Sequence, residues 1–511
     1  MRSFLLNYGI IAFYLIIGSS LLHLFILAIS HQKILSIVKS TMNSRFRELA
    51  GSEYVPPVSI LVPSYNEELT IIESVRSLMT LEFPMYEVVV INDGSADRTL
   101  QVLVDTFELK PTRLTGFRPL VQSKPIRGAY RNPLYPRLVV IDKANGGKAD
   151  ALNAGINVAK YPLVSTIDAD SLLEKDALIR LVKVYMENPE QHIAVGGNVR
   201  IANGSTIEDG RVLSVRLSNK WLPALQYVEY MKAFLGGRIG WSAMNGLLIV
   251  SGAFGLFRKD YLVKVGGYQE DCPGEDMNIV IKLHKYMLDR NLPYRIVFCP
   301  DAVCWTQAPD TLKVLSAQRR RWIRGSLWNV SRFRAMLFIP KYKVIGWLSL
   351  PYTIVYEILN PFVRLSGLAA LAGYVLLDMT QLPVLLIFLL VNLLIGMIFT
   401  CGSLLIEQLA FRRPIRTYDL LRMIGLSVVM AVGYDQINAL WKLLGLWDYI
   451  RRNNAWGNMV RRSWQDEAAH QAGSSSSKKD YQSTGRLMDG RSPICAYDRH
   501  LNMNGNGVKE Q

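Results

Sequence analysis

Two uncharged stretches, far apart in the chain, constrain its fold more than any other feature. Tyr8 to Ile29 runs for 22 positions without Asp, Glu, Lys or Arg, and Leu382 to Leu405 is also uncharged. About 20 apolar residues in a helix cross the core of a bilayer. We therefore predict a transmembrane helix at residues 8–29 and a second membrane region at residues 344–447. A cleaved signal peptide is the alternative for the first stretch, but the stretch is long and lacks a small-residue cleavage site.

The basic residues around the first stretch predict its orientation. Lys33, Lys39, Arg45 and Arg47 follow it, whereas only Arg2 precedes it. Basic loops remain on the cytoplasmic side of a membrane, so we expect the chain beyond about residue 32 to be cytoplasmic.

The second membrane region is less regular than the first. Val344 to Leu377 contains Glu357, Pro361 and Arg364, which predicts a kinked span whose two charges share a helix face turned from lipid. Met423 to Leu446 contains several polar residues and lies between two basic segments. A full crossing there cannot leave both basic segments in the cytoplasm. It re-enters, lies in the membrane interface, or crosses against the rule.

Composition excludes several classes of protein. Half of the 511 residues are hydrophobic, and the net charge is +16. Such a charge indicates either nucleic-acid binding or basic loops beside a membrane. The basic residues cluster beside apolar spans and no recognition module is present, so we expect no nucleic-acid partner. The cysteines form no CxxC pair and no zinc-ligand spacing, which indicates a reducing compartment.

Residues 50–310 predict a soluble α/β domain between the membrane regions. Four short, almost continuously apolar runs begin near residues 58, 86, 137 and 162, and they alternate with segments long enough for crossover helices. Such alternation predicts a doubly wound sheet, whose ligands bind at the carboxyl ends of the strands. Residues 311–343 predict interfacial helices. Residues 465–511 are rich in Ser, Gly, Asn and charge, and predict a disordered tail.

Polar and glycine-containing motifs follow these predicted strands. VPSYNEE (62–68) and INDGSADRT (91–99) end the first two runs, where a tyrosine and an acidic residue could hold a nucleoside. KANGGKADALNAG (143–155) opens a helix, and its N-terminus with a nearby lysine suits a diphosphate. A turn, a helix cap or a solvated loop is the alternative for each motif taken alone.

Carboxylates carry the remaining signals. Asp168 and Asp170 of TIDADS are two residues apart on a predicted extended chain and would project to one side, which suits one hard divalent cation completed by phosphates. SGAFGLF (251–257) predicts a strand with close backbone approach to a ligand. Glu275 and Asp276 begin a predicted helix, where they could cap it or supply a general base.

The order of these motifs resembles that of family-2 glycosyltransferases with the GT-A fold. The elements are SYNE, NDGS, GGKADALN, DAD, SGAFG, GED and QRRRW, and they span residues 56–325. With membrane spans on both sides, the chain is similar to the cellulose, hyaluronan and poly-N-acetylglucosamine synthases, and most similar to the last branch. The fold that this resemblance implies is an α/β GT-A domain inserted between transmembrane helices.

The resemblance also implies a role for each site residue. It places the uracil and ribose of a UDP-sugar at Tyr65, Glu67 and Asp93, and the nucleotide or diphosphate at Lys148. It places the ribose and metal at Asp168, a Mg²⁺ or Mn²⁺ ligand at Asp170, and the acceptor at Ser251, Gly252 and Ala253. Asp276 matches the catalytic base, with Glu275 orienting it. Gln318, Arg321 and Trp322 match a QxxRW motif and share one helix face at i, i+3 and i+4.

The implied activity is inverting transfer from a UDP-sugar to a growing β-linked polysaccharide, with export through the membrane spans and possible accessory export subunits. The alternative enzyme adds one sugar to a lipid or other acceptor. An inactive binding protein on the same fold is disfavoured because every motif carboxylate is present. Arg319, Arg320 and Arg324 of QRRRWIRG are expected to form a basic collar near lipid headgroups. The basic residues within 104–135 predict a solvated insertion, with an acceptor or partner site as the alternative.

Overall fold

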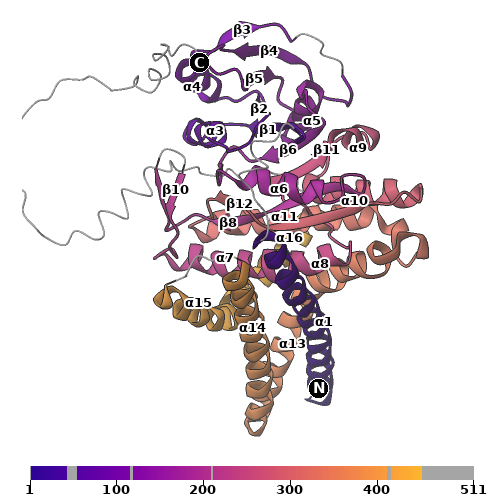
Figure 1. Ribbon diagram of the computed structural model, residues 1–511. Helices are drawn as coiled ribbons and strands as arrows, with labels where there is room; N and C mark the ends of the chain where they lie inside the picture. The colour runs from indigo at the N-terminus through magenta and orange to yellow at the C-terminus, as the bar shows by residue number, and fades with distance from the viewer. Residues whose placement is uncertain (1, 43–53, 115–118, 209–210, 411–415, 452–511) are drawn as a thin grey trace, which may run out of the picture. The chain divides into compact units, whose positions relative to one another are not determined.

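A ten-stranded mixed sheet is formed by residues that follow the first predicted membrane segment and precede the later ones, and in Figure 1 the long helices extend from one side of the domain that contains it. In the computed structural model, which describes residues 2–42, 54–114, 119–208, 211–410 and 416–451, its order is β3-β4-β5-β2-β1-β6-β11-β8-β12-β7. The strands are β1 (Val58–Ser64), β2 (Tyr86–Asn92), β3 (Lys110–Thr112), β4 (Ile126–Arg131), β5 (Leu138–Lys143), β6 (Leu163–Ile167), β7 (Ser171–Leu173), β8 (His192–Ile201), β11 (Phe254–Arg258) and β12 (Arg295–Thr306). A separate pair is formed by β9 (Thr206–Glu208) and β10 (Arg211–Ser214). The predicted tail at residues 465–511 lies outside the described residues.

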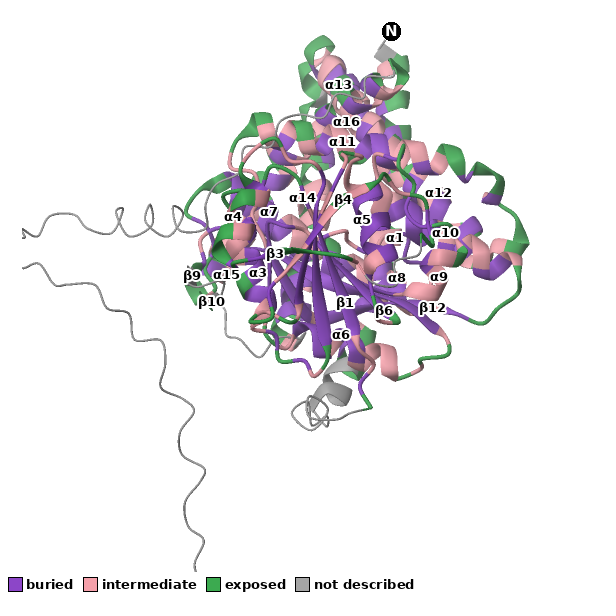
Figure 2. Cartoon of the chain, turned by 90° about the horizontal axis from the view of Figure 1, so that it is seen from above, coloured by how far each residue is buried: buried purple, intermediate pink, exposed green. Residues whose placement is uncertain are grey.

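The four predicted strands form the parallel half of this sheet, which confirms the α/β fold. They are β1, β2, β5 and β6, and β1 pairs with both β2 and β6. Every residue of β2 is buried, as the continuous apolar run predicts for a strand covered on both faces (Figure 2). In the register of the sheet Ser64 pairs with Asn92, and Asn92 pairs with Asp142. The polar carboxyl ends of these strands therefore lie at one edge.

The other half of the sheet differs from a simple doubly wound arrangement. β11 is antiparallel to β6 and β8, and β7 is antiparallel to β12. The strand predicted at residues 251–257 begins only at Phe254, so Ser251 to Ala253 form the turn that leads into it. Within residues 104–135, β3 and β4 add two antiparallel strands at the edge beyond β5.

Helices pack against this sheet. α5 lies on β1 and β2, and α6 lies on β8 and β12. The helices of this region are α3 (Ile71–Met79), α4 (Thr99–Thr106), α5 (Lys148–Val158), α6 (Ala177–Met186), α7 (Trp221–Met231), the π-helix η1 (Lys232–Arg238), α8 (Ile239–Ala243), α9 (Lys259–Lys264), α10 (Glu275–Asp289) and α11 (Leu312–Arg332). In the predicted interfacial region, α11 is followed by the short 3₁₀ turns η2 (Arg334–Met336) and η3 (Pro340–Tyr342).

The long helices labelled α1, α14 and α13 extend from this domain in Figure 1. α1 (Arg2–Met42) contains the predicted span at 8–29, and α14 (Leu382–Ala410) contains the predicted span at 382–405. The third begins with the π-helix η4 (Ile345–Ser349), α12 (Leu350–Tyr352) and the π-helix η5 (Thr353–Leu359), and ends with α13 (Asn360–Leu377). The widened segment η5 ends at Leu359, two residues before Pro361, which lacks an N–H and would clash with the preceding turn of a regular α-helix.

These helices join the core of the sheet domain. Leu27 and Ile34 of α1 belong to the same buried apolar cluster as the sheet. Ser30 donates a hydrogen bond to the carbonyl of Gly236 in η1 at 3.0 Å, and Glu407 of α14 forms a buried ion pair with Arg200 of β8. The ends of α1 and α14 nearest the sheet are therefore anchored on it.

Four helices in the described part of the chain are long and apolar enough to cross a membrane, and the last spans Thr417–Ile450. It consists of α15 (Thr417–Val429), the π-helix η7 (Met430–Tyr434) and α16 (Asp435–Ile450). α15 packs against α7 and α16 packs against α11, both helices of the sheet domain. In Figure 1, α15 lies across α14 instead of running beside it.

Candidate active site

One pocket at the carboxyl edge of the sheet contains every site residue predicted from the sequence. Its volume is about 1850 Å³. Its lining includes Tyr65, Glu67, Asp93, Lys148, Asp168, Asp170, Ser251, Gly252, Ala253, Glu275, Asp276, Gln318, Arg321 and Trp322. These residues are scattered over more than half of the sequence, and the strand order brings them together.

At the end of β2, the Asp93 carboxylate organises the glycine loop that follows β5. It accepts hydrogen bonds from Lys143 Nζ at 2.5 Å and from the backbone N–H groups of Gly146 and Gly147 at 3.0 and 2.7 Å. Burial raises the pKa of Asp93, although Lys143 opposes the shift. The carboxylate is almost fully enclosed, so most of its hydrogen-bonding capacity is used within the protein. Gly147 has a positive φ of 86°, a conformation that favours glycine.

Lys143 is a residue that sequence reasoning missed. Its side chain is fully buried and also pairs with Asp150 on α5. A buried lysine needs anionic partners, and Asp93 and Asp150 supply them from two different elements. The available signal was a lysine closing the apolar run LVVIDK, but nothing in the local sequence indicated its partners.

Tyr65 and Glu67, the neighbouring residues predicted to bind a nucleoside, differ in how accessible their side chains are. Tyr65 has half of its surface exposed and lines the pocket. Glu67 is buried, its carboxylate accepts a hydrogen bond from Thr70 Oγ1 at 2.8 Å, and its backbone N–H donates to Thr99 Oγ1 at 2.8 Å. The exposed ring of Tyr65 is therefore the best-placed of these side chains for stacking on a base.

Lys148, the first residue of α5, contacts carboxylates from two parts of the chain, Asp168 after β6 and Glu275 on α10. Its Nζ lies 2.5 Å from Asp168 Oδ1 and 3.4 Å from Glu275 Oε1. Burial disfavours the charged lysine, but Asp168 and Glu275 outweigh it, and the pKa of Lys148 is raised. A Cβ at Gly252 would meet Lys148 Nζ at 2.9 Å, so a larger residue there would displace the ammonium from its present position. A lysine at this helix N-terminus can also reach a diphosphate.

Asp168 and Asp170 lie on a turn after β6, and not on extended chain as predicted. Ser171 N donates to Asp168 O at 3.0 Å, which closes the turn. Both carboxylates line the pocket. No group of three His, Cys, Asp or Glu side chains suited to a metal occurs among the residues that the structure describes. Two hard oxygen donors fit a Mg²⁺ or Mn²⁺ ion whose other ligands are phosphate oxygens and water.

The predicted base begins α10, as expected. Burial, with the adjacent charge of Glu275, raises the pKa of Asp276 to about 6. Asp276 Oδ1 accepts a hydrogen bond from the N–H of Met277 at 2.8 Å. A carboxylate with a pKa near the working pH is a better proton acceptor than one of ordinary pKa, because it is still ionised yet more basic.

The raised pKa of Asp276 predicts that the reaction rate depends on pH. The base must be ionised to accept a proton, so kcat/KM for the acceptor is expected to rise with pH, reach half its maximum near pH 6 and then level off. Initial rates measured between about pH 5 and about pH 8 at fixed metal concentration would show the rise. A flat profile across that range would contradict the assignment of Asp276 as the group that titrates.

Glycine contacts hold α11 against the start of α10. A Cβ on Gly325 would meet Gly274 Cα at 3.0 Å, so the two backbones touch. Asn329 Nδ2 donates to the carbonyls of Gly274 and Gly325, both at 3.0 Å, and Asn329 Oδ1 accepts from Asn278 at 3.0 Å. Gly325, which ends QRRRWIRG, therefore packs on Gly274, the glycine of GED. This contact places the face with Gln318, Arg321 and Trp322 at the pocket that holds Asp276.

The basic collar predicted for the other arginines of this helix is wrong. Arg319 is only 4% exposed, donates to Glu229 Oε2 at 2.8 Å and lines the pocket. Arg320 makes two hydrogen bonds to the carboxylate of Asp448 on α16, at 2.7 and 2.6 Å. Arg324 is also buried. Glu229 lies on α7 and Asp448 lies on α16, so Arg319 and Arg320 pair with helices that pack near α11.

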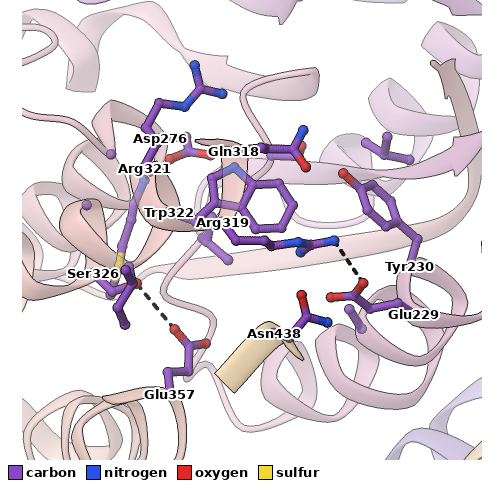
Figure 3. A pocket seen from close by; sticks show the side chains of 18 of the residues that line it. Glu229, Tyr230, Asp276, Gln318, Arg319, Arg321, Trp322, Ser326, Glu357 and Asn438 are labelled. Carbon is purple, nitrogen blue, oxygen red and sulfur yellow. Dashed lines mark hydrogen bonds and ion pairs between the residues drawn. The ribbon is translucent and has the colours of Figure 1, made fainter. Parts of the chain in front are cut away.

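The pocket continues beyond the predicted catalytic residues and reaches the long apolar helices. His23 of α1, Glu357 of η5 and Asp435 of α16 line it, together with Arg364. Ser326 donates to Glu357 at 3.3 Å, and Arg364 lies 3.7 Å from Asp435 (Figure 3 shows the first of these contacts). The two charges predicted to turn from lipid therefore face the pocket.

Comparisons with known proteins show that the chain is similar to glycosyltransferases. Residues 59–119 match the family model described as glycosyl transferase family 2, residues 127–325 match glycosyltransferase like family 2, and residues 274–469 match chitin synthase. A poly-β-1,6-N-acetyl-D-glucosamine synthase of Staphylococcus epidermidis is 29% identical over 317 residues, which are 60% of this chain and 66% of that protein. A synthase of the same name from Staphylococcus aureus is 30% identical over 268 residues, 52% of this chain and 54% of its own length. The chain thus spans less than two thirds of these relatives.

A solved structure shares the fold. A mannosyltransferase from Pyrobaculum calidifontis, in complex with GDP-mannose and Mn²⁺, superposes with a TM-score of 0.50 at 17% identity, and covers 85% of this chain and all of its own. At this identity the likeness concerns the arrangement of strands and helices.

Proposed function

The chain belongs to the family-2 glycosyltransferases, and from that premise we propose that it is a processive, inverting polysaccharide synthase. In this proposal it transfers N-acetylglucosamine from a UDP-sugar to a growing β-linked polymer at the cytoplasmic membrane face. The observation that carries the proposal is the single pocket that runs from Tyr65 past Asp276 to Glu357 and Asp435 between the membrane helices. A product formed at Asp276 would leave along this path.

The donor fits the strand-end part of the pocket. The exposed Tyr65 ring would stack on the uracil, and Lys148 and the N-terminus of α5 would face the diphosphate. N-acetylglucosamine is proposed because the relatives from Staphylococcus make a polymer of that sugar. With Asp93 engaged by Lys143 and the glycine loop, we assign it a positioning role: it shapes the loop on which the nucleotide rests.

Asp168 and Asp170 would hold a Mg²⁺ or Mn²⁺ ion. When bound, the ion would supply positive charge beside the diphosphate of the leaving UDP. Arg321, on the face of α11 that lines the pocket, adds a fixed guanidinium for the same purpose. Fixed charges aimed at a leaving group stabilise the transition state with little reorganisation.

Asp276 performs the proton transfer in this mechanism. Its carboxylate takes the proton from the acceptor hydroxyl, the hydroxyl oxygen bonds to the anomeric carbon, and the bond from that carbon to UDP breaks. Attack from the face opposite the leaving group inverts the configuration. Glu275, which also contacts Lys148, orients the base and raises its pKa.

The membrane topology follows from where the C-terminal helix packs. We propose that α1, the Ile345–Leu377 helix and α14 cross the membrane, and that the Thr417–Ile450 helix lies in its cytoplasmic interface. Exposed apolar residues recur on one side of that helix, at Tyr418, Leu421, Val428, Val432, Leu440, Leu444 and Trp447. Asp419, Ser427 and Asp448 on the same helix are buried. With this arrangement both basic segments that flank the helix stay in the cytoplasm.

The experiment that tests the function supplies a panel of labelled UDP-sugars to the protein in membranes, with Mg²⁺ or Mn²⁺, and measures UDP release and product size. We expect UDP-N-acetylglucosamine alone to give long polymer. Chelation of the metal with EDTA should stop synthesis, and excess Mg²⁺ or Mn²⁺ should restore it. A product extended by one sugar on a lipid would favour the non-processive alternative. Failure of every UDP-sugar would contradict the proposed donor.

A further inference from the structure

Arg319, Trp322, Glu229 and Tyr434 form a connected group of side chains at the membrane side of the catalytic centre. The Arg319 guanidinium lies over the Trp322 ring, 4.3 Å from its centroid, and Arg319 Nη2 donates to Glu229 Oε2 at 2.8 Å. The Tyr434 hydroxyl donates to the same Glu229 oxygen at 2.8 Å. The group therefore joins α11, α7 and the C-terminal helix through one carboxylate oxygen.

Burial separates the parts of this group into a fixed side and an open side. Arg319 and Tyr434 are 4% and 3% exposed, whereas Trp322 is 41% exposed and lines the pocket. Tyr230 lines the pocket beside it, with its ring centroid 6.4 Å from that of Trp322. The buried arginine thus covers part of the indole, and the rest of the indole remains open to the pocket. An exposed indole in a sugar-binding pocket can stack on a sugar ring.

Figure 3 shows Arg319, Trp322 and Glu229 of this group between two sets of pocket residues. Asp276 and Gln318 lie on one side of Trp322 in that view, and Glu357 and Asn438 lie on the other, with the Arg319–Glu229 pair between them. A polymer that passes from Asp276 toward the membrane helices would therefore pass the open face of Trp322.

We propose that Arg319, Glu229 and Tyr434 are positioning residues that hold Trp322 against the growing chain, and that they thereby determine how many sugars are added before the chain dissociates. The inference rests on the proposed polymer synthesis and extends it to chain length. A planar guanidinium attracts the face of an aromatic ring and limits its rotation. Glu229 compensates the charge of Arg319, and Tyr434 fixes Glu229, so the orientation of Trp322 depends on where the C-terminal helix lies.

Two conservative variants test this chain of contacts. Arg319→Lys keeps the charge but loses the planar group that covers the indole. Tyr434→Phe removes only the hydroxyl that binds Glu229. Matched controls are Arg332→Lys on α11 and Tyr418→Phe on α15, both at exposed positions of the same helices. If one test variant fails to fold, as judged by gel filtration and thermal unfolding, the other carries the test.

The readouts are product length, donor KM, and hydrolysis of the UDP-sugar without acceptor. The number of sugars added per binding event scales with the elongation rate divided by the rate at which the chain dissociates. Weaker binding of the chain by Trp322 is therefore expected to shorten the polymer by about fivefold. Donor KM and hydrolysis should stay within about twofold of the wild type, and the controls should make full-length polymer.

Two outcomes would overturn the inference. Polymer of unchanged length from both variants would show that Trp322 needs no such support. A parallel fall in hydrolysis and length would show a general structural role. Failure of the proposed function differs from both outcomes, because the wild-type protein itself would then add a single sugar. That result would overturn the inference as well.

Discussion

Asp276→Asn is expected to lower polymer synthesis by about a thousandfold while UDP binding stays nearly unchanged. Asparagine has almost the same shape as aspartate but cannot accept a proton, so the acceptor hydroxyl is left without a base. The donor contacts proposed for Tyr65 and Lys148 do not involve Asp276. Polymer synthesis would be followed by incorporation of labelled sugar, and UDP affinity by calorimetry on the same preparation.

Asp271→Asn is the matched control for this change. Asp271 is an exposed residue five positions earlier, in the loop that leads into α10, and it is absent from the pocket lining. It should retain wild-type activity. Substantial synthesis by Asp276→Asn, or an equal loss in both variants, would remove Asp276 from the role of base.

Arg321→Ala should lower kcat by between about a hundredfold and about a thousandfold, which is the usual consequence of removing one charge aimed at a developing anion. The contact of Gly325 with Gly274 holds α11 at the pocket, and so keeps the guanidinium near the proposed diphosphate site. Arg321→Lys should recover part of the loss, because it restores the charge without the two-pronged geometry. Initial rates at saturating UDP-sugar would measure both.

The control for Arg321 is Arg332→Ala on the same helix, where the side chain is exposed and outside the pocket lining. It should change kcat by less than about twofold. If Arg321→Ala were equally mild, the charge on the leaving UDP would have to be balanced by other groups, and the proposed role of the QxxRW face would be wrong.

Much of the fold could be predicted because its signals are local. The runs at 58, 86, 137 and 162 are apolar at nearly every position, and a chain segment of that kind can be stable only when both faces are covered. Their polar ends had to meet at one edge of a parallel sheet. This rule is sufficient to place Tyr65, Asp93 and Asp168 in one pocket from the sequence.

The environments of the arginine side chains in QRRRWIRG could not be predicted in the same way. Arg319, Arg320 and Arg321 are three consecutive arginines. On a helix they differ only in the direction in which each side chain points. Arg319 faces Glu229 and Arg320 faces Asp448, residues that lie 90 positions before and 128 positions after them. Whether a charged side chain is solvated or paired depends on what packs against it, and no local pattern contains that information.

By itself, the sequence indicated the four parallel strands, the long apolar helices and the motif residues that line the pocket, because periodicity, length and turn residues act over short distances. Only the tertiary structure decided that Lys143 neutralises Asp93, that Arg319 supports Trp322, and that the last apolar helix lies against α7 and α11. These outcomes depend on burial and pairing between distant segments, and a charge is stable in a protein interior only where the fold has placed its partner.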